Sequence, residues 1–454
     1  MNCSLLIKNG RVVTEEGTLS ADVFIEEGKI VHIGKSGEED KAEKVIDVKG
    51  QFVLPGFIDP HVHFNDPGLT NSEDFYTGTS AAAAGGVTTV LEHPLTFPLP
   101  DNLKAFNEKK EIAESKAVVD FGLFGACSEK NQGEMKQMME SGASAFKTFL
   151  TYSPEIPKLD DGQITERMAF LADKDVILAI HCENNDIVNY YTNEMRCLGR
   201  TKPEDYPDGR PEISEIEAVS RMTLFAQETG CKVNIAHCTL QAAVNIVDDR
   251  RRNGADVSVE TCPQYLLLNR TMLPELGVFG ICNPPLRREE EVSKLWDCIF
   301  DGKIDWICSD HATYTVEEKM EGREDIFKTP AGVTSVELCC QLFFSEGVMK
   351  RGLSIEAFAD LTSTNAAKRY NLYPQKGHIA VGADADIAIL NPEEIWTVDD
   401  KSLKQMMKWS PYNGMEVRGK ITKTIVNGIE AYDGKEVIAE KGSGRFIAPV
   451  RKVK

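Results

Sequence analysis

The sequence predicts an α/β protein in which a (β/α)8 TIM-like barrel carries a small β-sandwich domain built from both chain ends. Residues 54–375 alternate short apolar strand segments with helical segments, which is the pattern of such a barrel. Both chain ends instead show short alternating runs broken by Asn-Gly and Gly turns, as in "SLLIKNGRVV" and "GKITKTIVNG". We therefore expect residues 1–53 and 376–454 to form the β domain and residues 54–375 to form the barrel.

Eight segments of the middle region are apolar enough to be strands that are buried on both faces. In chain order they are 56–64 (GFIDPHVHF), 86–94 (GVTTVLEHP), 117–126 (AVVDFGLFGA), 144–150 (SAFKTFL), 176–184 (VILAIHCEN), 232–239 (KVNIAHCT), 256–265 (DVSVETCPQY) and 304–312 (IDWICSDHA). Helical stretches lie between most of them, and eight strands each followed by a helix indicate a closed barrel. A doubly wound open sheet is the alternative, but the chain has no glycine-rich phosphate-binding turn to support it.

Two of the helical stretches have clear start and stop signals. Residues 71–86 begin with Asn71 or Ser72 as the capping residue, continue with acidic residues in the first turn and end at a Gly-Gly pair. Residues 213–230 are apolar at helical spacing and end at Gly230. We expect a helix over each stretch.

The composition restricts the partners and the compartment. A net charge of −20 argues against a nucleic acid or an anionic membrane, since both require a basic face. The chain has no long apolar run, and its start lacks the parts of a secretory signal. Its 12 cysteines follow no repeated spacing, as expected for buried free thiols in a cytoplasmic protein. We expect a cytoplasmic protein whose partner is a small molecule.

Histidines gather where such barrels keep their active sites. Five of the eight histidines end predicted strands, namely His61, His63, His181, His237 and His311. His61 and His63 are two residues apart on one strand, so both can reach the same ion. Asp310 adds a carboxylate at the end of the last strand, whereas His311, next to it, points to the other face. Each residue alone has an ordinary structural explanation, but together they suit zinc or a similar divalent ion.

Lys147 and His93 end two further strands of the barrel. A protonated lysine would be repelled by bound metal ions and desolvated. The ordinary interpretation of Lys147 is a side chain that extends to solvent. The alternative is a neutral amine that has taken up carbon dioxide and bridges two metal ions as a carbamate, and composition leaves both open. His93 can line the pocket.

By these motifs the chain resembles the cyclic amidohydrolases, which comprise hydantoinases, dihydropyrimidinases, allantoinases and dihydroorotases. The resemblance covers nearly the whole chain and rests on "DPHVHFNDPG", "FKTFLTY", "HCEN", "ETCPQYLLL", "NPPLR", "SDH" and "STNAAKRYNLYPQKGHIAVGADADIAIL". It implies a hydrolase of the EC 3.5.2 class that opens the amide C–N bond of a cyclic ureide or imide. It also implies a homo-oligomer, either a tetramer or a dimer.

The resemblance further implies two divalent metal ions, usually zinc. The implied ligands are His61, His63 and Asp310 for one ion, His181 and His237 for the other, and carboxylated Lys147 as the bridge. Two such ions lower the pKa of a water toward neutrality, and Asp310 would pass its proton to the leaving ring nitrogen. A scaffold homologue without activity is disfavoured because every ligand position is filled. A mononuclear deaminase on the same barrel is a further alternative, in which the lysine is not used as a bridge, and counting the bound metal ions would separate the two.

Residues near these ligands distinguish the substrates. Dihydroorotases carry an arginine two residues after the second histidine, and here that position is Asn65, which disfavours a carboxylate substrate unless Arg287 or another cation substitutes. Tyr152, five residues after Lys147, matches the tyrosine that donates to the oxyanion in hydantoinases and dihydropyrimidinases. Without the family, Tyr152 would be a half-buried loop tyrosine. Allantoinases share "HVHFNDPG" and "SPYNG" but typically lack this tyrosine.

Two substrate contacts depart from the hydantoinase pattern. Asn283 stands where those enzymes have the serine of Ser-Pro-Pro, and Ala331 stands in place of an Asn-Gly contact that is made largely through the main chain. We therefore favour an enzyme of the hydantoinase or dihydropyrimidinase type. Allantoinase is the alternative, and dihydroorotase is less favoured.

Overall fold

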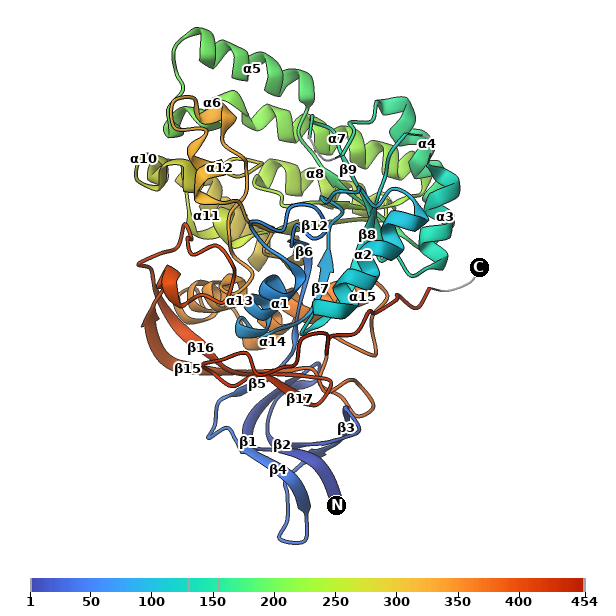
Figure 1. Ribbon diagram of the computed structural model, residues 1–454, viewed down its shortest axis with the longest axis vertical. Helices are drawn as coiled ribbons and strands as arrows, with labels where there is room; N and C mark the ends of the chain where they lie inside the picture. The colour runs from blue at the N-terminus through green and yellow to red at the C-terminus, as the bar shows by residue number, and fades with distance from the viewer. Residues whose placement is uncertain (1, 130, 154–155, 452–454) are drawn as a thin grey trace.

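The computed structural model describes residues 2–129, 131–153 and 156–451, and Figure 1 shows two parts. The upper part contains a parallel sheet surrounded by helices, and the lower part is a β unit made from both chain ends. This arrangement confirms the predicted fold class.

The parallel sheet closes into a barrel. Its strands are β6 (Phe57–His63), β7 (Val87–Glu92), β8 (Asp120–Ala126), β9 (Ala145–Phe149), β10 (Ile177–His181), β11 (Lys232–Ile235), β12 (Val257–Thr261), β13 (Trp306–Ile307) and β14 (His311–Ala312). Consecutive strands are neighbours from β6 to β13, and β14 pairs with β6. Because only residues 308–310 separate β13 from β14, these two short strands together occupy the position of the eighth strand of the barrel.

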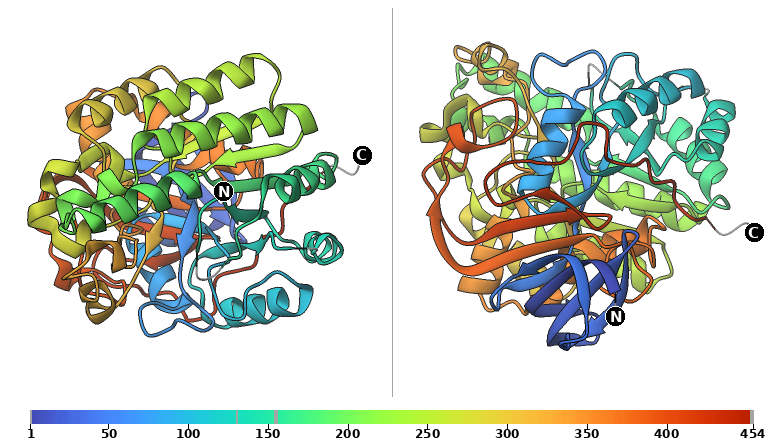
Figure 2. Two further views of the ribbon diagram at one scale, coloured as in Figure 1. Left: turned by 90° about the horizontal axis from the view of Figure 1, so that it is seen from above. Right: turned by 60° about the horizontal axis from the view of Figure 1, so that its bottom comes forward.

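Helices cover the outside of the barrel, as the view from above in Figure 2 shows. They are α1 (Phe75–Ala84), α2 (Leu103–Lys116), α3 (Gln132–Glu140), α4 (Asp161–Leu171), α5 (Asn185–Cys197), α6 (Tyr206–Gly209), α7 (Glu212–Thr229), α8 (Gln241–Arg252), α9 (Pro263–Leu267), α10 (Leu273–Leu276), α11 (Glu289–Phe300), α12 (Val316–Met320), α13 (Cys339–Phe343), α14 (Ile355–Ala359) and α15 (Asn365–Arg369). Helix α7 ends at Gly230, which has a φ of +73° and confirms the predicted stop. Within the described ranges, no helix is long and apolar enough to cross a membrane.

The predicted start of α1 is wrong. The capping residue is Asp74, whose carboxylate accepts a hydrogen bond from the backbone of the first turn, and that turn contains no acidic residue. Ser72 instead accepts a hydrogen bond from Asn65, and Asn71 donates to Glu318. These contacts hold the loop after β6 over the barrel, so the helix starts later than local sequence signals indicate.

The β unit joins the two chain ends in one sheet. Its strands are β1 (Asn2–Thr14), β2 (Gly17–Glu26), β3 (Lys29–Gly34), β4 (Lys41–Asp47), β5 (Phe52–Pro55), β15 (Ile387–Thr397), β16 (Glu416–Val426) and β17 (Ile429–Tyr432). The order is β17-β16-β15-β5-β1-β2-β3, with β4 paired to β1, and β5 pairs antiparallel with β15 (Figure 2). The exact domain boundaries stay a prediction.

A buried lysine connects the β unit to the barrel. Nζ of Lys376 lies 2.7 Å from Asp120 at the start of β8 and 2.5 Å from Asp386 just before β15. Asp384 completes the group at 3.3 Å. These three carboxylates are close enough together to hold a metal ion, but the ammonium lies among them and neutralises them.

All twelve cysteines are free thiols, and all except Cys197 are buried or nearly so. This confirms the prediction that most cysteines are buried thiols without a disulfide role. The hydrophobic core of the barrel includes several of them, for example Cys127 and Cys231.

Candidate active site

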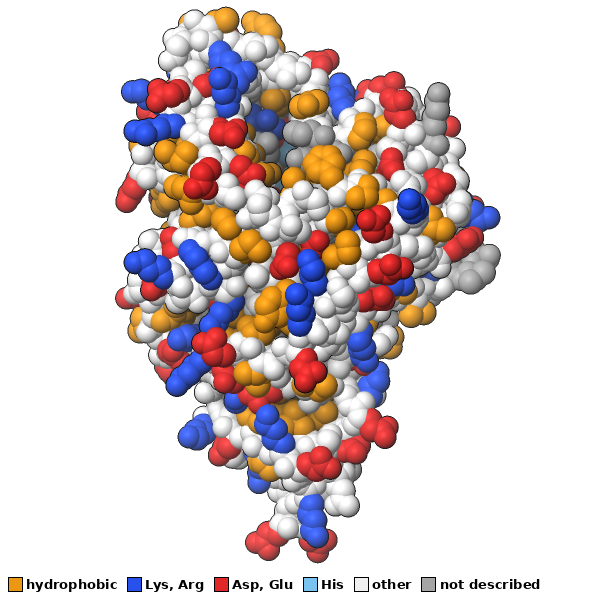
Figure 3. All heavy atoms as spheres, viewed as in Figure 1, with side chains coloured by type: hydrophobic (Ala, Val, Ile, Leu, Met, Phe, Trp, Pro, Cys, Tyr) orange, Lys and Arg blue, Asp and Glu red, His pale blue; other side chains and the backbone are white. Residues whose placement is uncertain are grey.

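The carboxyl ends of the barrel strands open into a cavity of about 480 Å³. A hollow is visible in the upper half of the face shown in Figure 3. The cavity is lined by all ten residues that the sequence predicts for the site: His61, His63, Asn65, Lys147, Tyr152, His181, His237, Asn283, Asp310 and Ala331. Residues from six barrel strands or the loops that follow them therefore meet in one place.

The first histidine pair converges on one carboxylate oxygen. Nε2 of His61 lies 3.2 Å from Oδ1 of Asp310, and Nε2 of His63 lies 3.3 Å from the same atom. The two histidines end β6 and share a face of it because they are two residues apart. Three donor atoms on three side chains thus surround a small space, as ligands of one ion would.

The eighth strand is interrupted at Asp310, which has a φ of +49°. This left-handed conformation, which Asp tolerates better than most residues, separates β13 from β14. Nδ1 of His311 instead accepts hydrogen bonds from the backbone N–H groups of Ser335, at 3.0 Å, and Val336, at 3.2 Å. His311 is fully buried and is not among the residues that line the cavity, in agreement with the expectation that it points to the other face.

The second histidine pair lies beside the first. Nδ1 of His181 is 3.0 Å from Nε2 of His237, and the ring centroids of His237 and His61 are 5.3 Å apart. His237 has a φ of +40°, an unusual value for a bulky residue and one that is found most often at functional sites. The four imidazoles form one contiguous group at the base of the cavity.

Glu260, which the sequence analysis missed, supports the first pair. Its Oε1 lies 2.5 Å from Nδ1 of His61, while its Oε2 accepts from the indole of Trp306 at 2.8 Å and from Asn234 at 3.0 Å. A carboxylate behind a histidine fixes the orientation of the ring and its tautomer. The sequence feature that could have identified Glu260 is its position, as a charged residue, at the carboxyl end of an apolar strand.

Glu183, also missed, supports the second pair. Its Oε2 lies 2.7 Å from Nε2 of His181 and 2.5 Å from a guanidinium nitrogen of Arg210. Nδ1 of His181 is therefore the ring nitrogen that faces His237. The sequence feature that could have identified Glu183 is its position two residues after His181, because side chains two residues apart lie on the same side of an extended segment.

The electrostatics favour neutral imidazoles. Burial lowers the pKa of His61 and of His237 well below its ordinary value, and it lowers the pKa of His181 as well. Neutral imidazole is the form that ligates metal ions. Burial raises the pKa of Asp310 to about 7 and that of Glu260 to about 7. Burial also acts to raise the pKa of Glu183, but its neighbouring Arg210 outweighs this and keeps that pKa well below its usual range.

Lys147 is a buried lysine whose environment is unusual for a protein interior. Its side chain is 0% exposed, and its amine has no hydrogen-bond partner among the described residues. Burial lowers the pKa of Lys147, and the ring of Phe149 lies 5.2 Å from its Nζ. The structure therefore excludes a side chain that extends to solvent. An unpaired buried amine next to four imidazoles fits a site that is completed by cations and by an anionic modification of the amine.

His93 supports the site from behind rather than lining it. Its ring stacks on that of His61 with 3.8 Å between centroids, and Nε2 of His93 lies 3.1 Å from the carbonyl of Pro60. Ring nitrogens of His61, His63 and His93 are close enough together for three metal ligands. The hydrogen bond to Pro60 nevertheless occupies one nitrogen of His93, and His93 is not among the residues that line the cavity.

The predicted substrate contacts occupy the walls and the rim. Tyr152 is 76% exposed at the rim, and not half-buried. The amide nitrogen of Asn65 donates to Ser72 at 2.9 Å and to the carbonyl of Thr313 at 3.0 Å, so it holds its own loop in place. Oδ1 of Asn283 accepts from the hydroxyl of Tyr206 at 2.8 Å.

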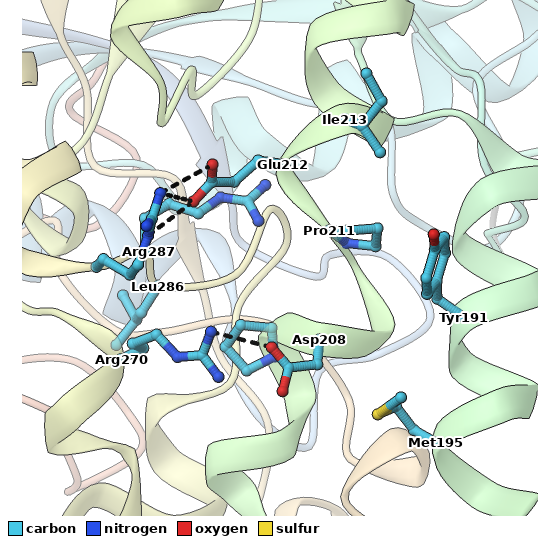
Figure 4. A pocket seen from close by; sticks show the side chains of 11 residues that line it. Tyr191, Met195, Asp208, Pro211, Glu212, Ile213, Arg270, Leu286 and Arg287 are labelled. Atoms are coloured by element: carbon cyan, nitrogen blue, oxygen red, sulfur yellow. Dashed lines mark hydrogen bonds and ion pairs between the residues drawn. The ribbon is translucent and has the colours of Figure 1, made fainter.

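A second pocket lies next to this cavity, beside α5, α6 and the start of α7 (Figure 4). Arg270 is paired with Asp208 and Arg288 with Glu212, as the dashed lines in Figure 4 mark. Arg287 lines this pocket, is paired with Glu215 at 2.9 Å and is not among the residues that line the histidine cavity. Arg210 and Lys328 line the histidine cavity, but the guanidinium of Arg210 is paired with the carboxylate of Glu183.

Comparisons with known proteins agree with this geometry. Residues 52–431 match the model of the amidohydrolase family. An allantoinase of Solibacter usitatus is 36% identical over 98% of this chain and 96% of its own length, and an L-hydantoinase of Paenarthrobacter aurescens is 32% identical over 98% and 97%. The solved L-hydantoinase (dihydropyrimidinase) from Arthrobacter aurescens superimposes with a TM-score of 0.96 at 32% identity, covering 98% of this chain and 100% of that one. A D-hydantoinase (dihydropyrimidinase) from Thermus sp. gives 0.91 at 31% identity, with 98% and 99% covered.

Proposed function

The chain belongs to the amidohydrolase family and is a cyclic amidohydrolase, and from this premise we propose which cyclic amides it opens and which residues do so. The enzyme hydrolyses the amide C–N bond of a cyclic ureide or imide. The observation that carries the proposal is the convergence of four histidines, one aspartate and an unpaired buried lysine on one cavity.

Members of this family depend on metal ions, and we propose two zinc ions here. The proposed ligands are His61, His63 and Asp310 for the first ion, His181 and His237 for the second, and carboxylated Lys147 for both. The neutral amine of Lys147 attacks the carbon of carbon dioxide, an N–C bond forms while one C=O π bond opens onto its oxygen, and the nitrogen loses one proton to water. The burial of Lys147 and its lowered pKa support this step. When bound, such ions supply a water of lowered pKa and polarise a carbonyl.

The remaining steps belong to side chains of the chain. Asp310 accepts a proton from the attacking water and delivers it to the leaving ring nitrogen, a role that its place beside both histidines of the first pair supports. The hydroxyl of Tyr152 donates to the carbonyl oxygen as negative charge develops on it. Asn283 and the main chain at Ala331 hold the ring amide, and Asn65 lines the wall that the ring faces.

We propose a substrate of the hydantoin or dihydrouracil type. Tyr152 supports this choice, as do structural neighbours named hydantoinase and dihydropyrimidinase. Allantoin is the second candidate, because a relative that is 36% identical is named allantoinase. Dihydroorotate is disfavoured, since Asn65 is uncharged and the guanidinium of Arg210 already binds Glu183.

The enzyme is proposed to act in the cytoplasm as a homotetramer or homodimer, without nucleic acid or membrane partners. The twelve free thiols support a reducing compartment. Residues 1–53 with 376–454 are proposed as one domain and residues 54–375 as the other. A separate cluster of buried residues within the β unit supports this division.

The test is a comparison of kcat/KM for hydantoin, dihydrouracil, allantoin and dihydroorotate on one zinc-loaded preparation, with metal content measured in parallel. We expect two ions per chain and the highest value for one of the three neutral rings. A preparation with two ions that opens none of the rings contradicts the proposed function. If dihydroorotate is the best substrate, the argument from Asn65 is wrong.

A further inference from the structure

Lys319 on α12 is a buried lysine without an acidic partner. Its side chain is 0% exposed, and no ion pair among the described residues includes it. Its Nζ donates instead to three backbone carbonyls: 2.8 Å to Pro330, 2.8 Å to Gly332 and 3.2 Å to Ile281. An ammonium has three donors, and three acceptors receive them.

These carbonyls belong to two segments that form the wall of the active-site cavity. Pro330 and Gly332 lie on either side of Ala331, and all three line the cavity. Ile281 lies two residues before Asn283, which also lines the cavity. The backbone N–H of Gly332 donates to the carbonyl of Ile281 at 2.9 Å, so the two segments are also bonded to each other.

Two aromatic rings complete the surroundings of the ammonium. Nζ of Lys319 is 5.7 Å from the ring centroid of Tyr314 and 5.4 Å from that of Trp409. The indole of Trp409 donates to the carbonyl of Tyr314 at 2.9 Å, and Tyr314 lines the cavity as well. Burying an unpaired charge is costly, and here three carbonyl dipoles and two aromatic faces surround it.

We propose that Lys319 is a positioning residue that fixes segments 281–283 and 330–332 in the orientation that holds the ring amide of the substrate. Helix α12 lies in the barrel part of the molecule, away from the β unit (Figure 1). The part of this inference that concerns the substrate rests on the proposed function. The part that concerns the two segments does not.

The two parts are tested separately, with Lys319→Met as the main variant. Methionine keeps much of the apolar stem and removes all three donors. Lys104→Met, at an exposed position on α2, is the matched control. In hydrogen exchange followed by mass spectrometry, amides of 281–283 and 331–332 exchange at least about tenfold faster in Lys319→Met than in the control, because their local opening costs less. Amides of β10 and β11 keep their rates.

On the zinc-loaded enzymes, Lys319→Met retains the metal content of the wild type while kcat/KM falls by about 10²-fold, the scale of a misplaced substrate. The loss appears mainly as a higher KM, because the segments hold the ring in the ground state as well as in the transition state. If Lys319→Met does not fold, Lys319→Gln, which keeps two donors on a shorter chain, is judged by the same exchange criterion.

Unchanged exchange in both segments overturns the inference, whatever the activity. Faster exchange with an unchanged KM on the best substrate overturns its substrate part. Faster exchange in a variant whose wild type opens no cyclic amide supports the structural role of Lys319 and instead refutes the proposed function.

Discussion

Oε1 of Glu260 lies 2.5 Å from Nδ1 of His61, and this contact leaves Nε2 of His61 to face Asp310. On the opposite side of the site, Glu183 contacts Nε2 of His181, so that Nδ1 of that ring faces the cavity. Two buried carboxylates therefore select different ring nitrogens in the two histidine pairs. The ring orientation in each pair therefore depends on a carboxylate that contacts one of its histidines, Glu260 for His61 and Glu183 for His181.

Glu260→Gln is expected to lower zinc affinity by about 10- to 100-fold, the usual cost of losing a residue that orients a metal ligand. Glutamine has one oxygen and one amide nitrogen in place of the two carboxylate oxygens. If its oxygen accepted from His61, its N–H groups would face the N–H donors of Trp306 and Asn234, so the side chain could not hold His61 as the carboxylate does. Competition with a fluorescent zinc chelator measures the affinity. Glu337→Gln is the control, because burial raises the pKa of Glu337 to about 7 as well, and its carboxylate accepts from the backbone N–H of Lys404 rather than from a histidine. Equal affinities for the two variants would remove Glu260 from this role.

Lys147→Ala is expected to lose most of its bound metal and nearly all activity. The reason is that Lys147 is the buried, unpaired amine beside the histidines, whereas Lys328, which also lines the cavity, is exposed. Short carboxylic acids added with zinc should restore part of the activity, since they can replace the missing anion. Elemental analysis is the measurement, and two metal ions retained per chain in Lys147→Ala would contradict the bridge.

Tyr152→Phe is expected to keep the metal content of the wild type and to lose roughly 10²–10³-fold in kcat, the cost of one oxyanion donor. Because Tyr152 is 76% exposed, the substitution should leave the thermal unfolding midpoint unchanged. Steady-state kinetics on the best substrate of the panel checks this. A kcat within about twofold of the wild type would show that the hydroxyl does not act in the rate-determining step.

Asn65→Ala is expected to lower the free energy of unfolding by about 1–3 kcal/mol, since the acceptors on Ser72 and Thr313 lose their donor inside the protein. Asn65 also has a φ of +62°, which alanine adopts less readily. Asn65→Gly removes the same hydrogen bonds without this backbone penalty, so it should be less destabilised than Asn65→Ala. Urea unfolding of the three proteins measures the difference. A glycine variant less stable than the alanine variant would contradict the backbone contribution.

Local sequence patterns were sufficient for the barrel and for the histidines and Asp310 at its strand ends, whereas Tyr152, Asn283 and Ala331 were named from the family resemblance. Burial on both faces identified each strand, because a parallel strand in a barrel has no polar side. The spacing of two placed His61 and His63 on one face, and the positions of these histidines, His181, His237 and Asp310 at strand ends placed all of them on one rim. Gly230 marked the end of α7 for the same local reason, since its left-handed conformation favours glycine.

What only the tertiary structure decided involves residues that are far apart in sequence. Glu260 and His61 are on β12 and β6, and Lys319 contacts carbonyls that are 11 to 38 residues away. The cap of α1 moved to Asp74 because Asn65 and Ser72 bond within a loop that closes over the barrel. Periodicity in the sequence indicates which face of a strand or helix a side chain lies on. Which distant residue it contacts depends on how the strands and loops pack, and no local sequence pattern contains that information.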